Sequence, residues 1–244
     1  NGRFVSGAQA FEKFDALIKE EKAKAEKFMQ QKGVSAAQVY DEMRKGWEKE
    51  VKAAAAPPPA DNKRRQVSTD GLPGKGNLQN PKITIVECSD FDCPFCSRAT
   101  GIVDQIMKEY GDKVAFYFRH YPLPMHKNAE PAHRAAVAAE KQGKFWEVWR
   151  ALFAGQSDRK AAGLSGAESA FAKIAKSEGL RWATALSDMN SPAAKQAVAD
   201  GNAQCEKLGT RGTPTFYING RMMSGAQPID RFAPIIEEEL RRKP

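Results

Sequence analysis

Residues 83–96 read ITIVECSDFDCPFC, and this stretch decides the fold. Its β-branched beginning, 83–86, is typical of a buried strand. The cysteine pair at its end is predicted to begin a helix through Tyr110, and residues 114–118 form the next strand. A strand, a helix and a second strand in this order predict a unit of a parallel sheet, and therefore an α/β fold.

The rest of the chain is predicted to be mostly helical before it returns to the sheet. Residues 129–208 are rich in alanine and are interrupted by several glycines. Strands are expected at 214–218 and 221–224, and a closing helix at 228–242.

Cys93 and Cys96 are the candidate reactive residues, and their spacing suits thiol–disulfide exchange. Cys93 is expected at the N-terminus of the helix, where unpaired N–H groups and the helix dipole favour an anion. The pKa of its thiol should therefore fall, and its nucleophilicity at neutral pH should rise. Pro94 suits the first helical turn, because its missing N–H would have no partner there. Cys96 lies one turn later and can resolve a mixed disulfide on Cys93, so the pair can cycle between dithiol and disulfide.

Metal binding is the main alternative for such a cysteine pair. A zinc site would need Cys88 and Cys205 as further ligands, and a strand residue and a distant helix suit tetrahedral geometry poorly. No metal is therefore expected, and no cofactor besides the redox-active disulfide of Cys93 and Cys96. Binding of Cu(I) by the two soft thiolates, in a copper carrier or chaperone, stays open.

Several motifs in order resemble the DsbA-like group of bacterial periplasmic thiol–disulfide oxidoreductases. They are Glu87 with Asp90-Phe91, CPFC at 93–96, LPMHKNA at 123–129, QGKFWE at 142–147 and GTPTF at 212–216. The resemblance covers about residues 75–242. It implies a thioredoxin fold with a helical insertion at about 126–200.

The resemblance also implies a cis bond between Thr213 and Pro214, beside the active-site sulfurs. An extended substrate could pair there with exposed backbone groups, so Thr213, Pro214 and Phe95 are candidate substrate-binding residues. Phe95 replaces the histidine of the most oxidising relatives, which removes one stabiliser of the thiolate. We therefore expect a potential nearer the about −180 mV of isomerases than the about −120 mV extreme. Threonine before the proline, rather than valine, also resembles isomerases.

Glu87 is a candidate catalytic residue at the end of the first strand. A buried carboxylate beneath the sulfurs could pass protons to and from Cys96. Arg119 or Lys113 could balance its charge. An exposed strand end is the alternative interpretation.

Cys88 and Cys205 are both expected to face the core between the sheet and the helix before Pro214. Relatives usually carry a bulky apolar residue at the first position and a small one at the second. In an oxidising compartment two nearby thiols tend to pair, so we expect a structural disulfide. Two inert buried thiols are the alternative.

The first 56 residues are expected to form a small all-α oligomerisation domain. Apolar residues recur at helical spacing within 8–32, and a second apolar face follows a capping box at Ser35 and Gln38. These apolar residues are Phe11, Phe14, Ile18, Ala25 and Phe28, then Val39, Met43, Trp47 and Val51. Two such helices bury little surface alone, so they need a partner, which is either the rest of the chain or another copy of the segment. We expect self-association through residues 1–56, and a frayed appendage is the alternative. The proline- and glycine-rich residues 57–80 are predicted to be a linker, which leaves 81–244 as the catalytic domain.

Composition excludes several classes of protein. Among 244 residues, 41% are hydrophobic and 28% charged, which argues against a disordered chain. The net charge of +8 is spread thinly and matches no nucleic-acid-binding motif. No apolar run is long enough to span a membrane. The chain begins with Asn1, so a removed signal peptide and a periplasmic location are expected.

Together these features predict a homo-oligomeric disulfide isomerase or reductase that acts on misfolded secreted proteins. The layout resembles DsbC- and DsbG-like dimers and ScsC-like proteins, and a dimer is favoured over a trimer. A DsbD-like or DsbB-like membrane redox partner is expected, and no nucleic acid. A DsbA-like oxidase is the alternative enzyme.

Overall fold

The computed structural model describes residues 11–45 and 61–242. These residues belong to two compact units, Asn1–Pro59 and Ala60–Pro244.

The described part of the first unit contains helix α1 (Phe11–Lys32) and helical residues 39–45. Helix α1 ends at Lys32, and the next residue, Gly33, has a φ of 65° that glycine adopts without strain. One half of the predicted capping box forms, because the backbone N–H of Ser35 donates to Oε1 of Gln38 at 3.2 Å. The other half does not, since the Ser35 hydroxyl donates to the same Oε1 and the Gln38 N–H donates to the Ser35 carbonyl oxygen. Trp47 and Val51, like the rest of the predicted domain beyond residue 45, lie outside the described residues.

The described part of the second unit holds a five-stranded sheet in the order β1-β3-β2-β4-β5. Strands β2 and β3 are parallel and joined by helix α3, as predicted, while the other neighbours are antiparallel. The elements are β1 (Gly74–Gly76), β2 (Ile83–Ser89), α3 (Pro94–Tyr110), β3 (Val114–His120), β4 (Thr215–Ile218) and β5 (Arg221–Ser224).

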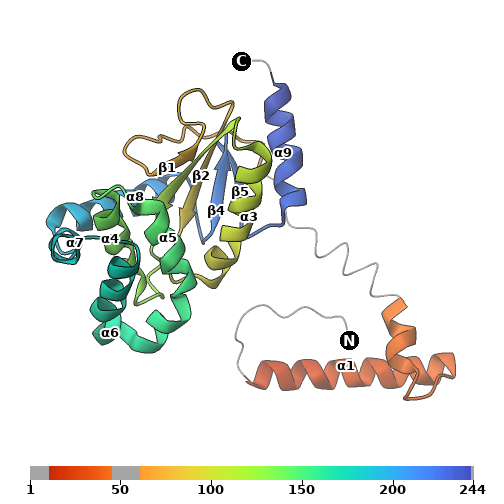
Figure 1. Ribbon diagram of the computed structural model, residues 1–244. Helices are drawn as coiled ribbons and strands as arrows, with labels where there is room; N and C mark the ends of the chain where they lie inside the picture. Colours follow the sequence, from red (N-terminus) through yellow and green to blue (C-terminus); the bar gives the residue numbers. More distant parts are fainter. Residues whose placement is uncertain (1–10, 46–60, 243–244) are drawn as a thin grey trace. The chain divides into compact units, whose positions relative to one another are not determined.

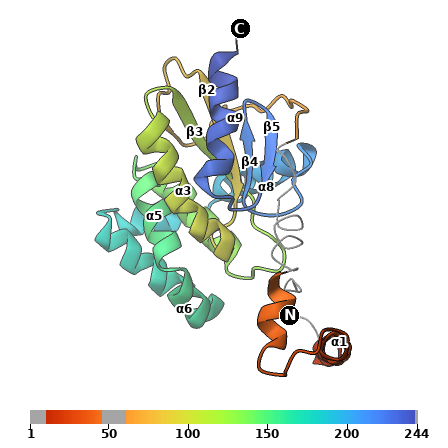
Figure 2. The ribbon, with the colours of Figure 1, turned by 90° about the vertical axis from the view of Figure 1, so that its right-hand side faces the viewer.

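Helices cover both faces of this sheet (Figures 1 and 2). Helix α3 and the C-terminal helix α9 (Ile229–Arg241) pack on one face, where Val103 and Phe232 meet strand residues such as Phe116. Helix α8 (Pro192–Lys207) lies on the other face, where Cys205 and Tyr217 share a second core. Because side chains alternate along a strand, neighbouring residues of β2 enter different cores.

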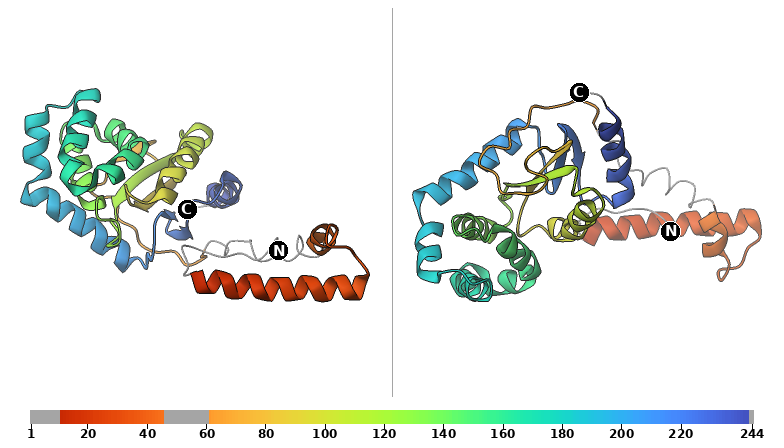
Figure 3. Two further views of the ribbon diagram at one scale, coloured as in Figure 1. Left: turned by 90° about the horizontal axis from the view of Figure 1, so that it is seen from below. Right: turned by 45° about the horizontal axis from the view of Figure 1, so that its top comes forward.

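The predicted helical insertion forms a third core beside the sheet (Figure 3). Its helices are α4 (Ala129–Glu140), α5 (Phe145–Ala154), α6 (Gln156–Ser177) and α7 (Trp182–Met189). Cys93 and Cys96 belong to the same core as Trp149 and Phe153 of α5. The insertion therefore packs directly against the segment that carries the cysteine pair.

The predicted linker is wrong for residues 61–80, which are part of the second unit. Strand β1 pairs with β3, and the backbone N–H of Arg65 donates to Gly220 O at 3.0 Å. Glycine here permits close pairing rather than flexibility, since a Cβ at Gly74 would lie 2.7 Å from the Tyr117 ring. The other linker residues, 57–60, lie outside the described residues.

Candidate active site

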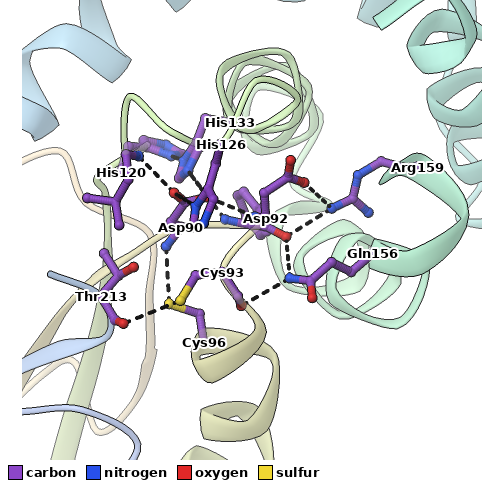
Figure 4. Close-up of polar contacts among 12 residues, drawn as sticks. Asp90, Asp92, Cys93, Cys96, His120, His126, His133, Gln156, Arg159 and Thr213 are labelled. Atoms are coloured by element: carbon purple, nitrogen blue, oxygen red, sulfur yellow. Dashed lines mark hydrogen bonds and ion pairs between the residues drawn. The ribbon is translucent and has the colours of Figure 1, made fainter. Parts of the chain in front are cut away.

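The two cysteines of the CPFC motif lie where the sequence predicts, at the beginning of α3 (Figure 4). Cys93 is the N-cap residue, and Pro94 occupies the first helical position. Both cysteines are reduced and buried, with Cys93 4% and Cys96 0% exposed. The Cys93 thiol donates to the carbonyl oxygen of Thr213 at 3.3 Å, so the proline loop lies beside the outer sulfur.

The surroundings of the two sulfurs shift the pKa values of the two thiols in opposite directions. A hydrogen bond from the Cys96 thiol, with the N–H groups of Phe95 and Cys96, lowers the pKa of Cys93 from 9.0 to about 6. Burial, followed by the interactions with Cys93 and Glu87, raises the pKa of Cys96 well above 9.0. Cys93 can therefore attack a substrate disulfide as a thiolate, while Cys96 stays a protonated thiol until it attacks the mixed disulfide on Cys93.

Glu87 is buried rather than exposed, with 1% of its surface accessible. Burial raises the pKa of this carboxyl group to about 7, against the opposing influence of Ser89 and Lys75. At neutral pH the group can therefore both take and give a proton. Its charge acts on Cys96, which supports the interpretation as a proton carrier.

The expected partners of Glu87, Arg119 and Lys113, are not the cations that act on it. Arg119 lies opposite Cys88 in the β2–β3 register, and because side chains alternate it points to the other face. Its guanidinium donates to the carbonyl oxygen of Ser68. Lys113 precedes β3 and pairs with Asp112.

Lys75 of β1 is the cation that lowers the pKa of Glu87. Its Nζ lies 4.5 Å from the ring centroid of Trp146 and 4.7 Å from that of Trp149. Burial lowers the pKa of this amine, and the aromatic faces compensate in part for its lost hydration. Sequence reasoning missed Lys75 because it lies in the predicted linker.

Cys88 and Cys205 form a disulfide, as predicted, with their Cα atoms 6.1 Å apart. Both residues lie in the core between the sheet and α8. The four cysteines therefore divide into a structural pair and a free pair. Among residues 11–45 and 61–242, no group of three or more His, Cys, Asp or Glu side chains could hold a metal ion.

The candidate substrate-binding residues surround Cys93. Phe95 is 51% exposed, and the Arg98 guanidinium stacks on its ring at 4.4 Å. The peptide bond between Thr213 and Pro214 is cis, and the carbonyl oxygen of Pro214 accepts from Gly225 N at 2.8 Å. The Thr213 carbonyl oxygen therefore contacts the reactive thiol, while the Pro214 carbonyl oxygen is already paired within the chain.

Three histidines, His120, His126 and His133, lie beside the active-site segment (Figure 4). The Nδ1 atoms of His120 and His133 lie 2.8 Å apart, and burial lowers the pKa of His120 to about 3. Burial also lowers the pKa of His133, so this pair is neutral. His126, at the surface, instead contacts the Asp90 carboxylate at 2.7 Å.

Helix α6 holds the same segment from the opposite side (Figure 4). Nε2 of Gln156 donates to the carbonyl oxygens of Phe91 and Cys93, at 2.8 and 3.0 Å. Arg159, 2% exposed, also donates to Phe91 O at 3.0 Å. No sequence signal marks these two residues, because they lie more than sixty positions from the carbonyls that they bind.

A low-pKa cysteine at a helix N-terminus, a buried partner thiol one turn later and a carboxylate beneath them define a thiol–disulfide oxidoreductase. The family model described as "Thioredoxin" matches residues 75–238. The chain therefore belongs to the thioredoxin family.

Two solved structures are similar in fold and sequence. A thioredoxin-like oxidoreductase from Silicibacter pomeroyi is 28% identical with a TM-score of 0.61, over 71% of this chain and 95% of that one. Oxidised BdbD from Bacillus subtilis is 25% identical with a TM-score of 0.65, over 75% of this chain and 100% of that one. The predicted thioredoxin fold and helical insertion are confirmed.

Curated relatives include the Na(+)/H(+) antiporter NhaA 1 of Mycobacterium sp. (strain KMS), which is 34% identical over 146 residues. The match covers 59% of this chain but 23% of the antiporter, so the chain spans about a quarter of the length of such relatives. Ion transport is a property of those proteins. In the described residues of this chain, no helix is long and apolar enough to cross a membrane.

Proposed function

We propose that the chain is a homo-oligomeric disulfide isomerase or reductase that acts on misfolded secreted proteins in the periplasm. The observation that carries the proposal is the position of Cys93 at the N-cap of α3 beside the buried Cys96 thiol, where its pKa falls to about 6. Strong oxidants stabilise this thiolate further, to a pKa of about 3.5, while thioredoxin keeps it at about 7. A thiolate between these limits is nucleophilic at neutral pH without making the disulfide strongly oxidising.

The chemistry begins at the Cys93 sulfur. Its thiolate attacks one sulfur of a substrate disulfide, a mixed disulfide forms, and the other substrate sulfur leaves with the electron pair as a thiolate. In isomerisation, a substrate thiolate then attacks the mixed disulfide and releases Cys93, with no net oxidation. In reduction, Cys96 attacks the Cys93 sulfur instead, the substrate thiolate leaves, and Glu87 accepts the proton of Cys96.

Self-association is supported by the apolar side of α1. Phe14 is 39% and Ile18 is 65% exposed, one helical turn apart on the same side of the helix. Burying the exposed parts of these two side chains, which together equal about one whole side chain, contributes about 1.5 to 3 kcal/mol per chain. Several Cys93 sites in one assembly could then act on one misfolded substrate.

Isomerase activity requires the Cys93–Cys96 pair to be kept reduced. We propose a DsbD-like membrane reductase as the electron partner. A DsbB-like oxidase would instead recharge the disulfide and make the chain an oxidase.

The test combines solution mass with refolding of a scrambled multi-disulfide substrate. The full chain should be oligomeric and should restore substrate activity, and Cys93→Ser should abolish the restoration. Ile18→Lys should yield monomers that isomerise poorly, whereas Gln30→Lys, on the opposite side of α1, should leave both properties unchanged. Isomerase activity that survives Cys93→Ser, or a monomeric wild-type chain, would refute the proposal.

A further inference from the structure

The buried carboxylate of Asp90 joins two loops beside the cysteine pair. Its Oδ1 accepts from the backbone N–H of Asp92 at 2.8 Å. Its Oδ2 accepts from the backbone N–H of Leu123 at 2.8 Å and contacts Nδ1 of His126 at 2.7 Å. The segment before α3 is thus tied to the loop after β3 (Figure 4).

The backbone of Asp90 also touches both cysteines. Its N–H donates to Sγ of Cys96 at 3.5 Å, and its carbonyl oxygen accepts from the backbone N–H of Cys93 at 3.1 Å. A rotation of Asp90 would therefore move a donor away from the inner sulfur. The interactions of its carboxylate oppose that rotation.

We propose that Asp90 and His126 are positioning residues for Cys96, which hold the Asp90 N–H against its sulfur during thiol exchange. This inference rests on the exchange proposed for Cys93 and Cys96. In the resolving step, the Cys96 thiolate attacks the Cys93 sulfur; the Cys93–Cys96 bond forms, the mixed disulfide breaks, and the substrate sulfur takes the electron pair. In the reverse direction Cys96 leaves as the thiolate. A fixed N–H donor stabilises that thiolate in both directions.

Cys96 needs this donor more than Cys93 does. The outer sulfur is stabilised by N–H groups of the first turn of α3. The inner sulfur is fully buried, and Glu87 adds a negative charge nearby. Among the described residues, the backbone N–H that contacts the inner sulfur is that of Asp90.

His126 is the residue through which this role can be tested without disturbing the core. Its side chain is 21% exposed, while that of Asp90 is fully buried. His126→Asn keeps a donor close to the position of Nδ1, whereas His126→Phe keeps the ring and removes the donor. His126→Ala removes both, and Lys127→Ala is the control at the next position of the loop.

The experiment follows the reaction of the reduced full chain with dithionitrobenzoate, which releases one coloured thiolate in each of two steps. The first step is attack by Cys93, and the second is attack by Cys96 on the mixed disulfide. His126→Phe and His126→Ala should slow the second step about tenfold and change the first less than about twofold. His126→Asn and Lys127→Ala should react as the wild type does.

The outcomes separate the inference from the function on which it rests. Equal slowing of both steps would indicate general loosening and overturn the positioning role. An unchanged second step in His126→Phe and His126→Ala, or no recovery in His126→Asn, would overturn it as well. If the wild type showed no first step, the proposed exchange at Cys93 would itself fail.

Discussion

Replacing Glu87 by glutamine is expected to remove a pH-dependent loss of stability. The side chain is 1% exposed, and burial raises the pKa of its carboxyl group from 4.5 to about 7. The carboxyl group of Glu87 therefore binds its proton more tightly in the native state than in the unfolded chain. The stability that this contributes is fully present below pH 4.5 and is lost as the pH rises through 7. The shift corresponds to about 3 kcal/mol.

Urea unfolding of both proteins measures this contribution. With Cys93 and Cys96 reduced and the Cys88–Cys205 bridge intact, the stability advantage of Glu87→Gln should grow by about 2 to 3 kcal/mol between about pH 5 and about pH 8. Cys93 raises the pKa of Glu87, so its own titration does not cancel in the difference. The same substitution is therefore also compared in a Cys93→Ser background, where the thiolate titration is absent. Glu109→Gln, on the surface of α3, is the control. An advantage independent of pH would refute the assignment of a raised pKa to Glu87.

Three further predictions concern the cysteines and their support. Replacing Cys88 and Cys205 by alanine opens a loop of 117 residues and should lower the free energy of unfolding by about 4 to 5 kcal/mol; an unchanged urea midpoint would contradict this. The ultraviolet thiolate absorbance of reduced protein should rise with a midpoint near pH 6 and should lose this transition in Cys93→Ser; a midpoint near 9 would contradict the lowered pKa. Gln156→Leu leaves buried carbonyls with fewer donors and should cost about 1 to 3 kcal/mol, with Gln196→Leu on the exposed side of α8 as the control.

Local sequence signals were sufficient to predict the centre of the fold. The β-branched run of β2 and the proline after Cys93 each act through the backbone of a few neighbouring residues. The pairing of Cys88 with Cys205 was reached differently, from the resemblance to a family. Its confirmation shows that two positions 117 residues apart face one core.

The missed features depend on contacts between distant segments. Strand β1 is three residues long, Gly74–Gly76, and has no periodicity to reveal it; it forms because β3 offers an edge. Lys75 was consequently overlooked as the cation near Glu87. Such pairing has no local signal, because the donors and acceptors are contributed by different parts of the chain.

The helical insertion has a role in the active site that its position in the sequence does not suggest. The carbonyl oxygen of Phe91 accepts from both Gln156 and Arg159, and Gln156 also reaches the carbonyl oxygen of Cys93. These bonds fix the backbone that presents the nucleophile, while Asp90 fixes the same segment from the other side. A shift of α6 would therefore move the Cys93 backbone relative to Thr213 without any change in the cysteines themselves. The insertion and both free cysteines share one core. A change in the packing of the insertion is therefore expected to change the reactivity of the dithiol.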